Sequence, residues 1–166
     1  MEMQITIRKA LSDDAYDYTD CFIRCLQTAY KGIASDEFLN NLSVQREQRV
    51  QRFRESLTNT DLDLYCVKSD NEMIGFLTIH RKDAEIWAIY LLEEFRSKGS
   101  GKEMLDFAIG ELKNIGHKNI TLWVFEKNNG ARRFYEKNGF CFDGTKRETT
   151  NYGGLLVQLR YALTLN

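Results

Sequence analysis

The sequence predicts an α/β (α+β) fold in a single domain that spans residues 1–166. Short strand-like runs alternate with helix-like patterns along the whole chain. No internal repeat, low-complexity tract or linker composition divides it. A hydrophobic content of 43% and a charged content of 28% are typical of a soluble globular protein with a sizeable core.

The first third of the chain is predicted to form one strand and two helical regions. Residues 5–8 alternate apolar and polar side chains, which is the pattern of a strand. Ser12 is a suitable N-cap for an amphipathic helix that continues to about Tyr30, and Gly32 follows its end. A second helical region covers roughly residues 36–57.

The middle of the chain is predicted to form a hairpin, a third long strand and a helix. Residues 62–68 and 73–81 have the character of two strands joined by the turn 69–72. The apolar segment 86–92 is the third strand. Apolar side chains then recur three to four positions apart between residues 104 and 115, which is helical spacing.

The last third is predicted to form a strand, a helix and a closing pair of strands. Residues 120–124 are strand-like, and a helix follows with Asn128 as its cap and Gly139 at its end. Residues 140–147 and 155–163 form the closing antiparallel pair. The predicted order of elements is therefore β-α-α-β-β-β-α-β-α-β-β.

A basic, glycine-rich turn joins the third long strand to the helix that follows. A turn in this place presents unpaired backbone N–H groups at the positive end of a helix dipole, which binds phosphate. Its two glycines let the backbone approach a pyrophosphate, and its three basic side chains add positive charge. A P-loop and a dinucleotide fingerprint are excluded, because Glu103 and Met104 stand where those motifs need a hydroxyl and a glycine. The turn consists of Arg96-Ser97-Lys98-Gly99-Ser100-Gly101-Lys102.

Two motifs, in this order, resemble the signatures of the GNAT superfamily of acetyl-coenzyme A-dependent N-acetyltransferases. The first is Arg-x-x-Gly-x-Gly at residues 96–101, and the second is Asn-x-x-Ala-x-x-Phe-Tyr-x-x-x-Gly-Phe at residues 128–140. The resemblance covers about residues 60–145 and implies one N-acetyltransferase domain. It also implies a mixed, mostly antiparallel sheet flanked by helices, which splays open between the strand ending at Leu92 and the strand around Leu122.

The resemblance implies acetyl-coenzyme A as the cosubstrate, with no metal. It implies that the strand residues Ile89, Tyr90 and Leu91 bind the pantetheine arm through backbone hydrogen bonds, as an added strand would. The turn would bind the pyrophosphate. The remaining residues that the resemblance assigns to coenzyme binding are Asn128, Ala131 and Tyr135.

The resemblance also implies two catalytic side chains. Tyr135 is the acid that protonates the coenzyme A thiolate, and Glu85 is the base that deprotonates the amine. Strand alternation places Glu85 on the same face as Trp87, Ile89 and Leu91, subject to any bulge. The alternative is an exposed carboxylate at a strand end, with a water chain as the base. A backbone N–H near Leu91 would stabilise the oxyanion.

The acceptor is expected to be a primary amine of a small molecule, peptide or protein. In this superfamily the first helices and the last hairpin form its pocket, and their acidic and aromatic side chains would suit a cation. The alternative for these side chains is an ordinary solvated helix face, as it is for the arginine-rich segment 46–54. The pocket candidates are Asp13, Asp14, Tyr16, Asp17, Tyr18, Asp20, Tyr30, Lys31, Gly32, Tyr152, Gly153 and Gly154.

Other function classes are disfavoured by charge and composition. The net charge of −1 argues against nucleic acid or an anionic membrane as a partner. No apolar run approaches a membrane span, no signal peptide is expected, and the cytoplasm is the default location. The four cysteines are expected to be buried free thiols. A homodimer is possible. The alternative function is a non-catalytic acyl-coenzyme A sensor or interaction module, with a nucleic-acid-binding domain as a distant third.

Overall fold

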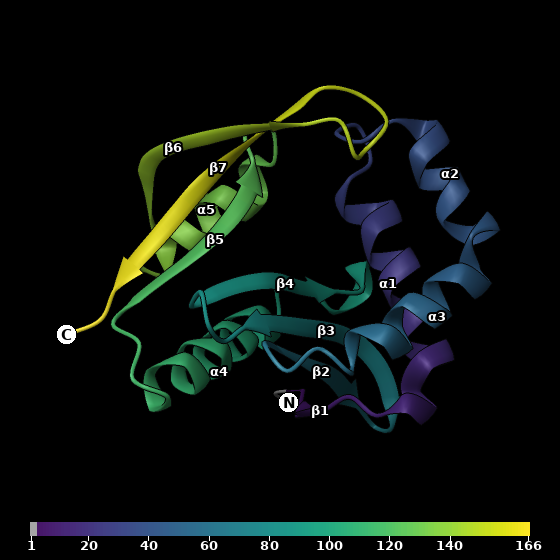
Figure 1. Cartoon of the computed structure of the whole chain (residues 1–166), viewed down its shortest axis with the longest axis horizontal. Coiled ribbons are helices and arrows are strands. Elements are labelled where there is room, and N and C mark those ends of the chain that lie inside the picture. Colours follow the sequence, from purple (N-terminus) through teal and green to yellow (C-terminus); the bar gives the residue numbers. More distant parts are fainter. Residues whose placement is uncertain (1–2) are drawn as a thin grey trace.

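The computed structural model describes residues 3–166, which form a seven-stranded sheet with helices on both faces (Figure 1). The strand order is β1-β2-β3-β4-β5-β7-β6, and every neighbouring pair is antiparallel except β4 and β5. The predicted mixed, mostly antiparallel sheet is confirmed. The strands are β1 (Thr6–Lys9), β2 (Leu62–Ser69), β3 (Glu72–His80), β4 (Glu85–Leu91), β5 (Asn119–Phe125), β6 (Cys141–Thr149) and β7 (Leu156–Thr164).

The helices divide between the two faces of the sheet and bury a separate core on each. The first core packs α1, α2 and α3 against one face, and the second packs α4 and α5 against the other. Strand β3 serves both cores, because Phe76 points to the first and Leu77 to the second. The helices are α1 (Ala15–Ala29), α2 (Asp36–Val44), α3 (Arg46–Ser56), α4 (Ser100–Asn114) and α5 (Asn129–Lys137).

The two parallel strands pair only through the first two residues of β4. Glu85 lies opposite Thr121 and Ile86 opposite Leu122, and beyond these pairs β4 and β5 diverge (Figure 1). Each strand stays fixed by its other neighbour, since β4 continues along β3 and β5 pairs with β7 over its whole length. The predicted splay of the sheet is confirmed. It leaves the inner edge of β4 open from Trp87 onward.

Two predicted helix boundaries are wrong. Ser12 does not cap α1, because the chain enters this helix through a short 3-10 helix, Ser12–Asp14. The predicted region 36–57 is two helices that meet at Gln45, where ψ is 19°. Neither a glycine nor a proline marks this break, so the sequence carries no local signal for it. The predicted hairpin between β2 and β3 is confirmed. Within residues 3–166, no helix is both long enough and apolar enough to cross a membrane.

Asp14 ties the start of α1 to β1. Its two carboxylate oxygens each accept a hydrogen bond of 2.8 Å from the Arg8 guanidinium, and it also accepts one of 2.7 Å from the Leu11 N–H. The hydrogen bonds from Arg8 are the largest cause of a lowered Asp14 pKa, which falls to about 2. The Asp14 carboxylate is therefore already paired with Arg8 within the fold.

We expect the Asp14→Asn variant to have a free energy of unfolding about 1–2 kcal/mol lower at pH 7, allowing for the partial exposure of Arg8. Since the folded-state pKa is depressed, the carboxylate stabilises the fold above its unfolded-state pKa and loses this effect as pH falls towards about 2. Urea unfolding of both proteins between pH 7 and pH 3 measures the difference. The exposed neighbour Asp13, changed to Asn, is the matched control. A gap for Asp14→Asn that stays constant with pH would contradict this assignment.

Candidate active site

The inner edge of β4 faces the opening between the two halves of the sheet. The Leu92 N–H donates to the Ile74 carbonyl on β3 at 2.8 Å, and backbone direction alternates along a strand. The backbone of Tyr90 therefore faces β3, where its carbonyl lies close against Gly75. The backbone groups of Ile89 and Leu91 face the opening. Of the three strand residues implied to bind coenzyme through the backbone, Tyr90 is the one that does not point there.

The N-terminus of α4 presents backbone N–H groups that have no acceptor within the helix. Gly99 precedes the first helical residue with φ +89°, a conformation that favours glycine, and no side chain caps the helix. The first bond into the helix runs from the Glu103 N–H to the Gly99 carbonyl at 3.1 Å, so the N–H groups of residues 100–102 have no intrahelical acceptor. Lys98 is exposed beside them. The position of the predicted phosphate-binding turn is thus a strand–turn–helix junction, as expected.

Arg96 has a second role that sequence reasoning missed. Its Nε donates to the Leu91 carbonyl at 3.1 Å, and its Nη2 donates to the Thr28 hydroxyl at 2.9 Å. The side chain thereby links the turn to the end of β4 and to α1. One of the carbonyls that faces the opening is therefore already engaged, while the Leu91 N–H and both backbone groups of Ile89 lie on the same edge.

The second motif forms the start of α5. The Asn128 side chain accepts a hydrogen bond of 3.2 Å from the Ala131 N–H, so the predicted cap is confirmed. Gly139 follows the helix with φ +92°. Ala131, Phe134 and Tyr135 lie against the second core. A Cβ at Gly101 would lie 3.6 Å from the Phe134 ring, an ordinary van der Waals contact, so packing does not require glycine there.

Four tyrosines meet at the open side of the sheet. Tyr30 comes from the end of α1, Tyr90 from β4, Tyr135 from α5 and Tyr152 from the β6–β7 connection. The hydroxyls of Tyr30 and Tyr90 are in contact, and the Tyr30 ring meets the Tyr152 ring edge-on at 5.8 Å. Burial raises the pKa of Tyr135 above its ordinary value, and the nearby Tyr30 raises it further. The sequence did not predict that the Tyr90 side chain belongs to this cluster.

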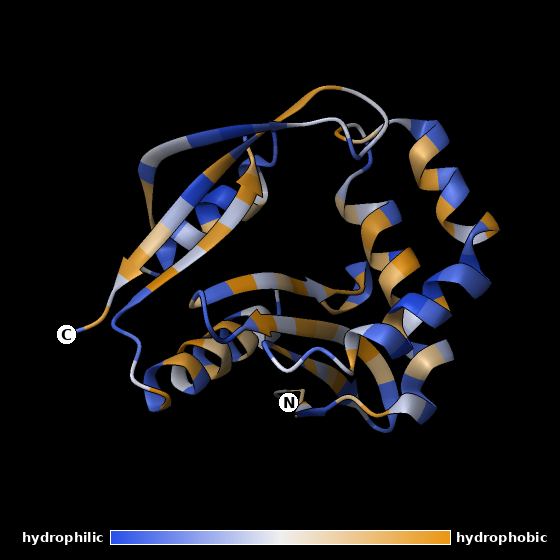
Figure 2. Ribbon diagram, in the orientation of Figure 1, coloured by the Kyte–Doolittle hydropathy of each residue, from blue (hydrophilic) through white to orange (hydrophobic). Residues whose placement is uncertain are grey.

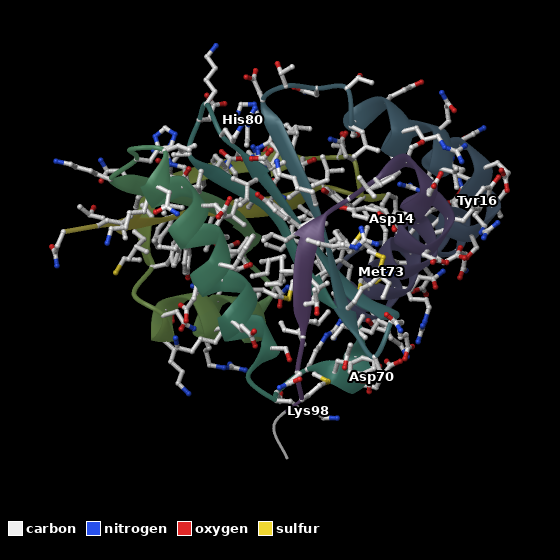
Figure 3. All side chains as sticks on the ribbon, turned by 90° about the horizontal axis from the view of Figure 1, so that it is seen from below. Asp14, Tyr16, Asp70, Met73, His80 and Lys98 are labelled. Atoms are coloured by element: carbon white, nitrogen blue, oxygen red, sulfur yellow. The ribbon has the colours of Figure 1, made fainter. Side chains whose placement is uncertain are left out.

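Glu85 lies in the short paired segment of β4 and β5, at the closed end of the opening between these two strands. It is opposite Thr121 in the parallel pair, and burial is the main cause of a raised pKa, partly offset by attraction to Arg147. Figure 3 places His80, which pairs with Glu85, and Lys98 of the turn at opposite edges of the molecule. The phosphate-binding turn and the candidate base therefore lie at opposite ends of β4.

A bulge changes the predicted face of Glu85. Thr78 pairs with Ala88 and Ile79 with Ile86, so Trp87 is an extra residue in β4. Ile89 and Leu91 consequently pack in the second core, on the other face from Ala88 and Tyr90. The prediction that Glu85, Trp87, Ile89 and Leu91 share one face is wrong, because strand alternation restarts at the bulge.

A cavity lies between α1, α3 and the sheet. Its volume is about 310 Å³. Trp87 and Ala88, at the bulge of β4, form part of its wall close in sequence to Glu85. Four of the remaining wall residues are aromatic, and two are arginines of α3. The lining is Tyr18, Thr19, Phe22, Arg49, Arg52, Phe53, Ser56, Leu62, Leu64, Phe76, Thr78, Trp87 and Ala88.

The acidic residues proposed for a cationic acceptor do not gather at this site. Asp14 pairs with Arg8, and Asp20 accepts hydrogen bonds of 2.6 and 2.8 Å from Arg46. Tyr16 lies at the outer edge of the molecule (Figure 3). Asp13 and Asp17 are exposed. Of the candidates on α1 itself, Tyr18 is the one that lines the cavity.

The cysteines are not part of this site. Three of them are buried free thiols, as predicted, whereas Cys141 is exposed, which corrects the prediction for that residue. It begins β6, whose first four residues are all exposed. Within the described residues, no group of three His, Cys, Asp or Glu side chains is placed to hold a metal ion.

Comparison with known proteins places this chain in a family. The model of the Acetyltransferase (GNAT) family matches residues 27–140. A spermidine N(1)-acetyltransferase of Thermoplasma acidophilum is 28% identical over 164 residues, which is 96% of this chain and 99% of that protein. An uncharacterised N-acetyltransferase of Archaeoglobus fulgidus is 29% identical over 139 residues, which is 78% of this chain and 88% of that protein.

The fold also has counterparts among solved structures. The PaiA N-acetyltransferase of Thermoplasma acidophilum, solved in complex with coenzyme A, superposes with a TM-score of 0.77 at 24% identity. The match covers 98% of this chain and 99% of that one. At this level of identity the likeness shows the fold.

Proposed function

Because the chain belongs to the GNAT family of acetyltransferases, we propose that it moves an acetyl group from acetyl-coenzyme A directly to a primary amine in a ternary complex. The acceptor is a small molecule, a peptide or a protein. The observation that carries this proposal is the opened sheet. An uncapped helix N-terminus stands at one end of the exposed β4 edge, and a half-buried carboxylate stands at the other.

The coenzyme would bind along the β4 edge. The N–H groups of residues 100–102 and the Lys98 side chain suit the pyrophosphate, because they combine free donors with positive charge. The backbone of Ile89 and the Leu91 N–H suit the amides of the pantetheine arm. The coenzyme supplies an acetyl group activated as a thioester. Another backbone N–H of this edge would stabilise the negative charge that develops on the acetyl oxygen.

Glu85 would remove a proton from the incoming ammonium group. An alkylamine with a pKa of about 10.4 is neutral in roughly one molecule in 2,500 at pH 7, a handicap of about 4.6 kcal/mol. Burial raises the pKa of Glu85, which makes its carboxylate a stronger base than an exposed one. Glu85 would then return the proton to solvent.

Tyr135 would act on the departing sulfur. Burial raises its pKa above 10, whereas a thiol has a pKa of about 8.5, so complete proton transfer from the phenol to the thiolate is uphill. The Tyr135 hydroxyl instead donates a hydrogen bond to the sulfur as negative charge develops there. The amine nitrogen loses a second proton when the amide forms, and the coenzyme A sulfur gains one. These two changes balance.

Thiol release with a panel of amines tests the proposal, and spermidine belongs in the panel because of the named relative. We expect amine-dependent release, and we expect the Lys98→Glu/Lys102→Glu variant to bind acetyl-coenzyme A at least about tenfold more weakly in calorimetry. Acidic residues in the first turn suit the helix dipole, so this variant should stay folded. Mutating Gly99 is less informative, because its positive φ makes any side chain there strained.

The control is Lys113→Glu, which reverses one lysine charge, against two in the double variant, about 16 Å from Lys102 near the other end of α4. Unchanged coenzyme affinity in the folded double variant would remove the turn from the binding site. Tight coenzyme binding without turnover of any amine would favour the sensor module over the enzyme.

A further inference from the structure

The cavity between α1, α3 and the sheet lies beside the candidate base. Trp87 and Ala88 of its wall follow Glu85 by two and three residues on β4. At about 3.3 Å per residue, the carboxylate of Glu85 stands within roughly 10 Å of the cavity wall. A volume of about 310 Å³ is in the range that small-molecule sites occupy. The cavity is therefore large enough, and close enough, to hold the acceptor.

Two arginines of this cavity have no acidic partner. Within residues 3–166, no carboxylate lies within ion-pair distance of Arg49 or Arg52, whereas Arg46, on the same helix, pairs with Asp20. The Arg49 Nε is buried and has no hydrogen-bond partner among the described residues. A buried donor left unsatisfied destabilises the fold, so it needs a compensating acceptor or a function.

The surroundings of these arginines are aromatic. The Arg49 guanidinium lies 5.4 Å from the centre of the Phe22 ring, and Phe53, Phe76 and Trp87 line the same cavity. Figure 2 shows α3 as a mostly hydrophilic helix, and most of its charge is exposed. Arg49 and Arg52 are the members of its arginine set that line the cavity. The sequence prediction of a solvated face is therefore incomplete for Arg49, which is partly buried.

We propose that the acceptor amine carries a carboxylate and an apolar body, as an α-amino acid with an aromatic or aliphatic side chain does. Arg49 and Arg52 bind the carboxylate, the aromatic wall binds the body, and the amine is directed towards Glu85. This inference rests on the proposed function and narrows its substrate class. A polyamine fits the cavity poorly, because it would place ammonium groups next to two unpaired guanidinium groups.

Matched pairs of acceptors test the inference. L-phenylalanine is compared with 2-phenylethylamine, and L-leucine with 3-methylbutylamine, so that each pair differs in the carboxylate. The amine of an amino acid is more acidic than that of an alkylamine, which alone favours its turnover. The decisive quantity is therefore the change in the kcat/KM ratio of each pair between the parent protein and the Arg52→Gln variant.

We expect Arg52→Gln and Arg49→Gln to lower this ratio about 10- to 100-fold, the range for loss of a charged hydrogen-bonded partner. Arg52 is exposed, so its replacement should not disturb folding even if Arg49→Gln does. Arg54→Gln is the control, because Arg54 lies on the same helix but outside the cavity, over the Tyr16 ring. A ratio unchanged by Arg52→Gln overturns the inference, and so does faster turnover of spermidine than of either amino acid.

Binding separates this inference from the proposed function. Calorimetry measures L-phenylalanine binding to the protein saturated with coenzyme A, with no turnover required. Binding that weakens about tenfold or more in Arg52→Gln supports the carboxylate site even if no amine is acetylated. Acetylation of amines that lack an acid, without any carboxylate-dependent binding, would leave the proposed function standing and end this inference.

Discussion

Replacing Glu85 with glutamine is expected to lower kcat by roughly ten- to ten-thousandfold, the range that loss of a general base covers. Glutamine keeps the size of the side chain but cannot accept a proton from the ammonium group. The loss should shrink as pH rises towards the pKa of the amine, because the neutral amine then forms without help. The pH dependence of kcat and kcat/KM for one amine measures both effects.

The raised pKa of Glu85 gives this test a second readout. The carboxylate must be ionised to act as a base, so the parent rate should rise with pH through a pKa above the usual value for glutamate. This step should vanish in Glu85→Gln. Asp83→Asn is the control. Asp83 is a neighbouring carboxylate that helps to raise the pKa of Glu85, but it is not the proposed base. A pH–rate profile unaltered by Glu85→Gln would assign deprotonation to water or another residue.

Replacing Tyr135 with phenylalanine is expected to lower kcat by about ten- to a hundredfold while coenzyme affinity changes little. The ring contacts to Phe134 and Phe140 remain. The substitution removes the hydroxyl and keeps the ring, so it should scarcely change the free energy of unfolding. Single-turnover kinetics, in which chemistry limits the rate, provide the measurement.

The neighbouring phenols decide whether the effect belongs to Tyr135. Tyr30→Phe and Tyr152→Phe make the same chemical change within the same cluster. If the hydroxyl of Tyr135 donates to the leaving sulfur, its removal should cost the most of the three. A normal single-turnover rate in Tyr135→Phe would assign this residue to packing alone. A larger loss in Tyr30→Phe would transfer the role to that phenol.

The sequence by itself determined the features that depend on neighbouring residues. The turn before α4 was recognisable because Gly99 provides a left-handed backbone where a strand gives way to a helix. The Asn128 cap was predictable because its acceptor reaches an N–H only three residues away. The β2–β3 hairpin was likewise predictable, because Asp70 and Asn71, both with positive φ, suit a tight turn.

Only the tertiary structure decided the features that join distant segments. Strand β7 inserts between β5 and β6, the bulge at Trp87 resets the faces of β4, and Arg96 finds its partners in Leu91 and Thr28. The tyrosine cluster and the cavity with Arg49 draw their residues from several such segments. Strand pairing, register and side-chain partners depend on packing between residues far apart in the chain. Local propensity and spacing do not specify which distant residues pack together.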